Sequence, residues 1–140
     1  MKTKIVSLAM AVLLVFTVNV SAFASAVPAK SSGGIHVMYT NTDDVTAAIS
    51  ISGTCASCSG VVDAKSGTTK ITATGLLKRV NSNGTTTIKT WTASVNGDTL
   101  YFDKSYYVAS GYTYQFQINA KVYRNGTVET VSMTDSDYCG

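Results

Sequence analysis

Residues 112–122 constrain the fold more than any other part of the chain, because their side chains alternate strictly between two kinds. The apolar positions are Tyr112, Tyr114, Phe116, Ile118, Ala120 and Val122, and the positions between them are Thr113, Gln115, Gln117, Asn119 and Lys121. A period of two is that of a strand with one buried and one exposed face. After residue 34 no stretch of useful length shows the 3.6-residue period of an amphipathic helix. The sequence therefore predicts an all-β domain.

Six further stretches have strand character, and turn residues separate them at nearly regular intervals. We expect strands at residues 45–51, 58–65, 69–80, 85–93, 100–104 and 127–134, with a candidate short strand at 35–39. Asn-Gly at 83–84 and at 125–126 favours tight hairpins, because both residues accept positive φ. Seven or eight short strands spaced in this way are typical of a β-sandwich or a small barrel.

One local motif favours the sandwich. Residues 108–114 read Val-Ala-Ser-Gly-Tyr-Thr-Tyr, which resembles the apolar-x-x-Gly-x-x-Tyr corner of fibronectin type III and other immunoglobulin-like domains. The resemblance implies that Gly111 takes the tight bend and that Tyr114 returns its hydroxyl to the preceding backbone. We therefore predict an immunoglobulin-like antiparallel β-sandwich.

The expected core of this sandwich consists of large apolar residues on the inward faces of its strands. Its main members are predicted to be Leu77, Trp91, Phe116 and Ile118. Trp91 and Ile88 have opposite parity along one strand. Either a β-bulge turns both side chains inward, or one of them faces solvent.

The wider layout resembles that of small secreted Firmicutes proteins of unknown function, from about residue 49 to residue 133. The matching positions are Leu77, Gly84, Trp91, Gly111, Tyr114 and Gly126. The resemblance implies secretion from a Gram-positive cell and an immunoglobulin-like sandwich. It implies no reaction.

Residues 1–26 have the pattern of a signal peptide that would precede the sandwich as a helix. Lys2 and Lys4 are followed by an apolar run of about 14 residues, short of the roughly 20 that a membrane span needs. Small-x-small patterns end at Ala24 and at Ala26, and cleavage is expected after Ala26, with Ala24 as the alternative. Residues 27–44 are expected to form a flexible lead-in and residues 45–140 the sandwich. The chain would touch a membrane only during export and then be extracellular.

The charge balance of the mature chain argues against nucleic acid as a partner. Without Lys2 and Lys4, nine Lys and Arg face eight Asp and Glu, and no basic run remains. A phosphate backbone is bound by several clustered cations. The expected partner is a protein or a glycan outside the cell.

Three cysteines remain after the signal peptide, in a compartment where disulfides are permitted. Alternating strand directions bring Cys139 to the same end of a sandwich as Cys55 and Cys58. We therefore expect a bridge from Cys139 to Cys58, with Cys55 as the alternative, and a third thiol that stays free or links two chains. Redox catalysis is not expected, since a turn at Ala56-Ser57 offers no helix N-terminus to activate a thiol.

No convincing catalytic or metal-binding group is present, and no cofactor is predicted. The one histidine, His36, lies near the flexible lead-in. Most acids fall in turns or at outward positions, where a solvated surface is the default. Asp103 or Glu129 could serve as half of a carboxylate pair in a hydrolase, but spacing selects no partner.

Tyrosines at outward positions form the candidate binding surface: Tyr101, Tyr106, Tyr107 and Tyr123. Tyr is favoured in interfaces because its ring is rigid and amphipathic. The sequence favours a secreted non-enzymatic binding module, as a monomer or a Cys-linked dimer. The alternatives are a small secreted hydrolase, or a structural protein that assembles through sheet edges or disulfides.

Overall fold

The computed structural model describes residues 38–140, and these form an all-β domain of seven antiparallel strands. The strands are β1 (Thr42–Ser52), β2 (Cys55–Ala64), β3 (Thr68–Asn81), β4 (Gly84–Val95), β5 (Thr99–Tyr107), β6 (Tyr112–Arg124) and β7 (Thr127–Cys139). The predicted all-β sandwich is confirmed. The predicted signal peptide, most of the lead-in and His36 lie outside the described residues.

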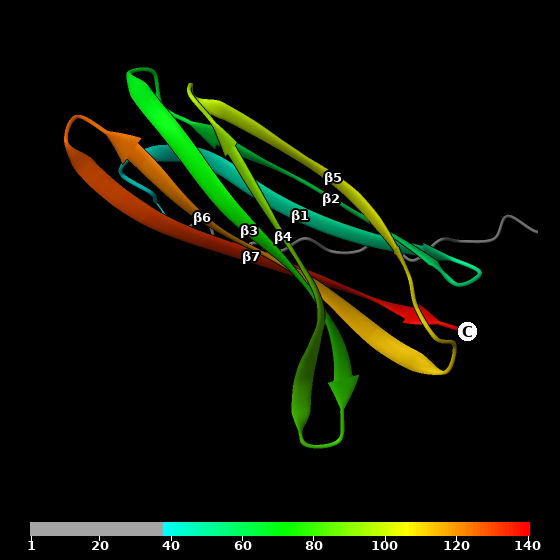
Figure 1. The fold of residues 1–140 in the computed structure, drawn as a ribbon. Helices are drawn as coiled ribbons and strands as arrows, with labels where there is room; N and C mark the ends of the chain where they lie inside the picture. Colours follow the sequence, from blue (N-terminus) through cyan, green and yellow to red (C-terminus); the bar gives the residue numbers. More distant parts are fainter. Residues whose placement is uncertain (1–37) are drawn as a thin grey trace, which may run out of the picture. The chain divides into compact units, whose positions relative to one another are not determined.

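Two sheets stack to make the sandwich (Figure 1). One sheet has the order β1-β2-β5 and the other has the order β4-β3-β6-β7. Constant-type immunoglobulin domains pair their fourth strand with the fifth. Here β4 instead pairs with β3 and widens the other sheet to four strands.

The core fills the space between the sheets with the alternate residues that the pattern indicates. Leu77, Phe116 and Ile118 are fully buried. Trp91 is half-buried, with its ring edge-on to Phe102 and Phe116 at 6.4 Å between centroids. The register of β3 with β4 shifts between Leu77 and Lys78, which leaves Ile88 without a partner, and both Ile88 and Trp91 pack against the core. A bulge therefore resolves their opposite parity.

Several strands extend beyond their predicted limits. β2 begins at Cys55, so Ala56-Ser57 lies inside a strand and not in a turn, and Ala56 is buried. β7 continues to Cys139 because its last residues pair with the start of β6. Of the candidate strand at 35–39, residues 35–37 lie outside the described part, and residues 38 and 39 are not in a strand.

Carboxylates of β7 close one side of the sandwich. Asp135 and Asp137 accept hydrogen bonds from the backbone N–H groups of Ile49 and Ile51 at 3.0 and 2.8 Å. Glu129 accepts from Thr40 N, Asn41 N and Thr42 Oγ1. An edge strand exposes unpaired backbone groups that invite aggregation, and inward-pointing charges blunt such an edge. These acids are therefore not merely solvated, as the sequence suggested, but join β7 of one sheet to β1 of the other.

The hydrogen bonds on Glu129 keep its carboxylate charged. Burial raises the pKa of this group, but the Thr42 hydroxyl and the backbone N–H groups of residues 40–42 lower it by more, so its net pKa lies below the ordinary value. Hydrogen bonds to the charged form stabilise that form. Glu129 is thus an acceptor fixed in the fold and is poorly suited to donate a proton in catalysis.

The predicted cysteine bridge is not formed, because all three thiols are free. The C-terminus does reach the β1–β2 hairpin, where Cys139 Sγ donates to Gly53 O at 3.3 Å (Figure 1). Cys58 lies three residues along β2 from Cys55, where the strand leaves this hairpin, which is roughly 10 Å at the rise of a strand. A disulfide joins Cα atoms less than about 7 Å apart, so a residue at the hairpin is too distant to bridge to Cys58. Cys55 faces outward from β2, whereas Cys139 is buried.

The Cys58 thiol is unsuited to redox chemistry. Burial raises its pKa to about 11, and only the thiolate is an effective nucleophile.

The corner before β6 ties the chain to itself. Gly111 has φ +84° and donates its N–H to Cys139 O at 2.7 Å. Tyr114 is buried, and its hydroxyl donates to Ala109 O at 2.8 Å. This bond fixes the entry of the chain into β6, an inner strand of the four-stranded sheet.

Replacing Tyr114 with phenylalanine is expected to lower the free energy of unfolding by about 1 kcal/mol, because it removes one hydrogen bond and leaves the ring in place. Ala109 is exposed, so water can satisfy its carbonyl afterwards. Urea unfolding measures the loss. Tyr138→Phe, at an exposed tyrosine of the same sheet, is the control and should leave the midpoint unchanged. Equal midpoints for the two variants would show that the corner bond contributes nothing.

Candidate ligand-binding face

The outward side of the four-stranded sheet is the candidate site, and we call it the β4-β3-β6-β7 face. It consists of the residues that alternate with the buried ones, and the strand register arranges them in rows. One row is Ser94, Thr72, Lys121 and Thr130, and the next is Thr92, Thr74, Asn119 and Ser132. A further row runs through Thr90, Leu76, Gln117 and Thr134. The face therefore presents mainly hydroxyl and amide groups.

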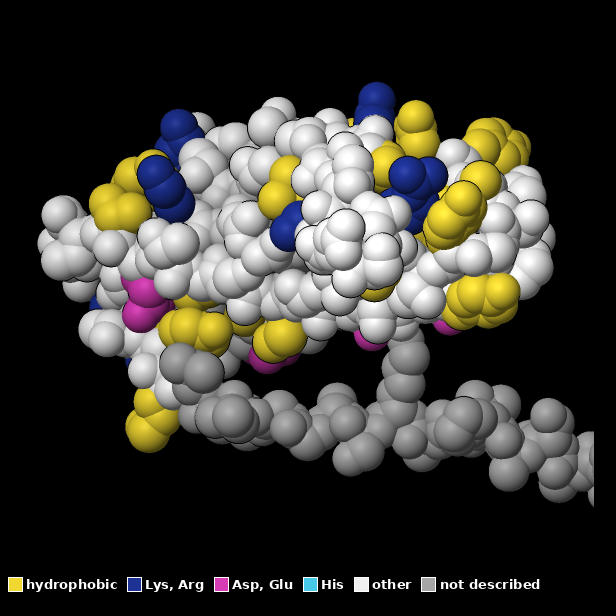
Figure 2. Space-filling model, turned by 90° about the horizontal axis from the view of Figure 1, so that it is seen from below, with side chains coloured by type: hydrophobic (Ala, Val, Ile, Leu, Met, Phe, Trp, Pro, Cys, Tyr) yellow, Lys and Arg dark blue, Asp and Glu magenta, His cyan; other side chains and the backbone are white. Residues whose placement is uncertain are grey.

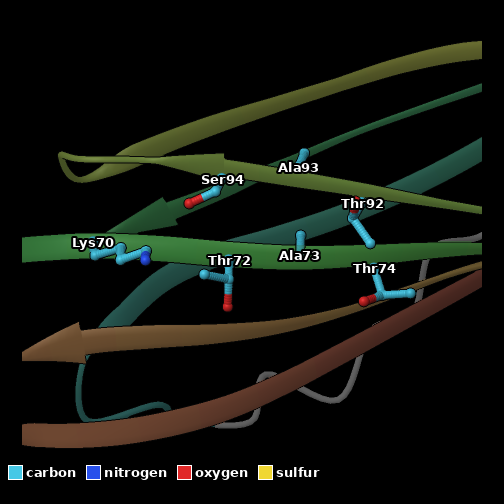
Figure 3. A pocket seen from close by; sticks show the side chains of 7 residues that line it. All are labelled: Lys70, Thr72, Ala73, Thr74, Thr92, Ala93 and Ser94. Carbon is cyan, nitrogen blue, oxygen red and sulfur yellow. The ribbon is translucent and has the colours of Figure 1, made fainter.

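Two neighbouring hollows lie on this face, one on each side of Thr72 and Thr74. The first, of about 350 Å³, lies between β3 and β4 and is lined by Lys70, Thr72, Ala73, Thr74, Thr92, Ala93 and Ser94. In Figure 3, Thr72 and Thr74 point to one side of β3 and Ala73 points to the other. The second, of about 290 Å³, lies between β3 and the strands β6 and β7 and is lined by Thr72, Thr74, Asn119, Ala120, Lys121, Tyr123 and Thr130.

Hydrogen bonds between side chains fix part of this surface in advance. Gln117 Nε2 donates to Asn119 Oδ1 and to Ser132 Oγ, both at 3.0 Å, and Ser132 Oγ donates to Asn119 Oδ1 at 2.8 Å. Lys78 Nζ donates to Gln117 Oε1 and extends the network to β3. A surface whose groups are already ordered loses less entropy when it binds a ligand.

The two outer faces of the sandwich differ in charge. The outward positions of β3, β4, β6 and β7 that pair across the sheet include Lys70, Lys78 and Lys121 and no Asp or Glu. On the three-stranded sheet, the outward positions that pair across strands include Asp44, Asp63 and Asp103 and no Lys or Arg. In Figure 2, most of the visible Lys and Arg surface lies in the upper part of the view, while the Asp and Glu surface lies toward the lower side of the domain.

The four tyrosines of the predicted binding surface do not meet in one patch. Tyr101 and Tyr107 are 77% and 79% exposed on the outer face of the three-stranded sheet. Tyr106 packs edge-on to Trp91 at 6.4 Å between centroids, beneath the Lys89 ammonium. Only Tyr123 lies on the face with the hollows.

The two acids considered for a hydrolase lie in different sheets. Asp103 lies on β5 in one sheet, and Glu129 lies on β7 in the other, where it is bound to residues 40–42. Within residues 38–140, no group of three His, Cys, Asp or Glu side chains is placed to hold a metal ion. Among these same residues there is also no helix long and apolar enough to cross a membrane.

Sequence reasoning did not select Lys70, Thr72, Thr74, Asn119 or Lys121 as site residues. Alternation places each of them outward, but each is an ordinary surface residue by itself. The signal in the sequence is that the outward positions of four separate strands contain no carboxylate. That signal appears only when the strand order of the sheet is known.

Comparison with known proteins assigns no family to the chain. No family model matches it, and no curated protein matches it. Among solved structures, the solution structure of R. palustris CsgH aligns with a TM-score of 0.41 and 12% identity over 64% of this chain and 89% of that protein. Spo0M, a sporulation control protein from Bacillus subtilis, aligns with a TM-score of 0.36 and 11% identity over 71% of this chain. The match spans about half (48%) of Spo0M.

Proposed function

We propose that this chain is an exported, non-enzymatic binding module that holds a glycan on its β4-β3-β6-β7 face. Export is supported by the signal-peptide pattern of residues 1–26. The observation that carries the proposal is the pair of hollows around Thr72 and Thr74, which hydroxyl, amide and ammonium groups surround. Such groups can exchange hydrogen bonds with the many hydroxyls of a sugar chain.

The shape and chemistry of the face support a glycan over an apolar partner. Both hollows are open to solvent and are lined by residues of the sheet itself, which suits an extended chain rather than a small enclosed molecule. Tyr123 supplies one aromatic ring at the border of the second hollow, and it is half-buried, so its ring position is restricted. A rigid ring beside hydrogen-bonding groups allows a sugar ring to stack on it at low entropic cost.

A glycan array carrying both neutral and acidic sugars tests this proposal with a matched pair of variants. Tyr123→Ala is expected to weaken binding about tenfold or more, the loss typical of a tyrosine at the centre of an interface. Tyr101→Ala removes an exposed tyrosine from the opposite face and should bind as the unmodified protein does. The melting temperature of each variant checks that its fold is retained.

Two results would contradict the proposal. Absence of binding to every sugar on the array would exclude glycan binding of useful affinity. Loss of binding in Tyr101→Ala, with Tyr123→Ala unaffected, would move the site to the three-stranded sheet.

A further inference from the structure

Two lysines and one tyrosine form a small cluster at one end of the β4-β3-β6-β7 face. In the register of β3 with β6, Lys70 lies directly opposite Tyr123, and Thr72 lies opposite Lys121. Lys121 is also the next residue on the same side of β6 as Tyr123. Directly opposite side chains have Cβ atoms about 5 Å apart, and same-side neighbours along a strand are about 7 Å apart. The Tyr123 ring therefore has one ammonium group across the sheet and another along its own strand.

Both lysine side chains are accessible, since Lys70 and Lys121 are exposed, and the paired outward positions around them carry no carboxylate. The acids of β7 point to the other side of their strand, toward β1. Two cations beside a ring, with no acid at the paired outward positions of their sheet, are complementary in charge to a carboxylate attached to a sugar.

We infer that the ligand of this face is an acidic polysaccharide, whose sugar ring stacks on Tyr123 while its carboxylate lies between Lys70 Nζ and Lys121 Nζ. This inference rests on the proposed function and names its substrate class. The hydroxyls of Thr72 and Thr130 line the same hollow and can bind the hydroxyls of that sugar. An acidic polymer without sugar rings would neither stack on Tyr123 nor offer ring hydroxyls to Thr72 and Thr130.

The rest of the face suits an extended polymer rather than a single acidic sugar. Lys78 lies eight residues from Lys70 on the same side of β3, about 27 Å away at the rise of a strand. The network of Gln117, Asn119 and Ser132 lies between these two lysines. Asp44, Asp63 and Asp103 on the opposite sheet would repel the same polymer, so the charge of the domain also selects the face.

The test compares polygalacturonate with its fully methyl-esterified form, which keeps the sugar backbone and removes the charge. The full chain is expected to bind the acid form at least tenfold more tightly at about 0.05 M salt, and to lose most of that preference at about 0.5 M salt, where screening is strong. Lys70→Gln with Lys121→Gln should weaken binding to the acid form roughly tenfold and weaken binding to the ester much less, because the glutamine amides can still donate hydrogen bonds to sugar hydroxyls.

Lys89→Gln with Lys104→Gln is the control, because it changes the net charge by the same amount and leaves the face intact. Equal losses in the control would overturn the inference, since net charge alone would then explain binding. Equal affinity for acid and ester would also overturn it and leave the proposed glycan binding standing.

Poly(glycerol phosphate) bound as tightly as polygalacturonate would show that the sugar ring is not recognised, and would overturn the inference as well. Binding to neither polysaccharide would count against the inference, and no binding to any sugar on the array would contradict the proposed function itself.

Discussion

Replacing Gly60 with alanine is expected to lower the free energy of unfolding by about 3 kcal/mol or more, the upper range for an overpacked core. A Cβ at this position would lie 2.4 Å from the backbone oxygen of Thr46 and 2.3 Å from Ile118 Cδ1. Alanine is intrinsically better than glycine in a strand by only about 1 kcal/mol. The clash is the larger effect because the Thr46 carbonyl belongs to β1, which pairs with β2 at this level.

Because Thr46 O is a backbone atom, shortening the Ile118 side chain is expected to restore little of the stability that Gly60→Ala loses. Ile118→Val removes Cδ1 but leaves the backbone oxygen where it is. Urea unfolding of both single variants and of the double variant measures the coupling between them. A double variant as stable as Ile118→Val alone would show that the side chain, and not the backbone, limits the space at Gly60.

Gly75→Ala is expected to lower the free energy of unfolding by about 2 kcal/mol, because the added Cβ would clash with a side chain rather than with backbone. Gly75 lies on the inward side of β3, and its added Cβ would meet Phe102 Cζ at 2.4 Å and Phe102 Cε1 at 2.7 Å. Phe102 comes from β5 of the other sheet and packs against Phe116 with their centroids 5.5 Å apart. The missing side chain of Gly75 thus provides the space into which an aromatic ring of the opposite sheet fits.

Because this obstacle is a side chain, a second substitution should relieve it. Phe102→Leu removes the ring atoms that approach Gly75. In that background we expect Gly75→Ala to cost less than half of its effect in the unmodified protein. Calorimetric melting of the four proteins tests this, since 1 kcal/mol shifts the melting temperature of a domain of this size by about 4–8 °C. Additive effects of the two substitutions would contradict the proposed contact.

Gly75 also bears on the candidate site, because β3 carries both this core contact and part of the binding face. Thr74 and Leu76, on either side of Gly75, point outward, and Thr74 borders both hollows. A shift of β3 away from Phe102 would displace that row. Loss of glycan binding in Gly75→Ala is therefore expected to accompany its loss of stability, and Phe102→Leu should restore part of both.

The carboxylates of β7 show where local pattern and packing diverge. From the sequence, Asp135 and Asp137 are acids near the C-terminus, and a solvated strand end explains them. In the fold they accept hydrogen bonds from Ile49 and Ile51, residues that lie 86 positions earlier. A period of two indicates which side of a strand a residue occupies, but it does not indicate which strand of the other sheet lies opposite.

The sequence by itself determined the strands, their inward and outward faces and the hairpins, because alternation and turn residues act over only a few positions. It also predicted that the C-terminus meets the first hairpin, since strand directions alternate. Tertiary structure decided which outward residues share a face, and it placed Tyr123 among lysines and threonines while Tyr101 and Tyr107 lie on the other sheet. It also decided that Cys58 and Cys139 stay apart and that Gly60 and Gly75 leave space for neighbouring atoms. The physical reason is that these features depend on strand order and on the stacking of two sheets, which join residues far apart in the chain.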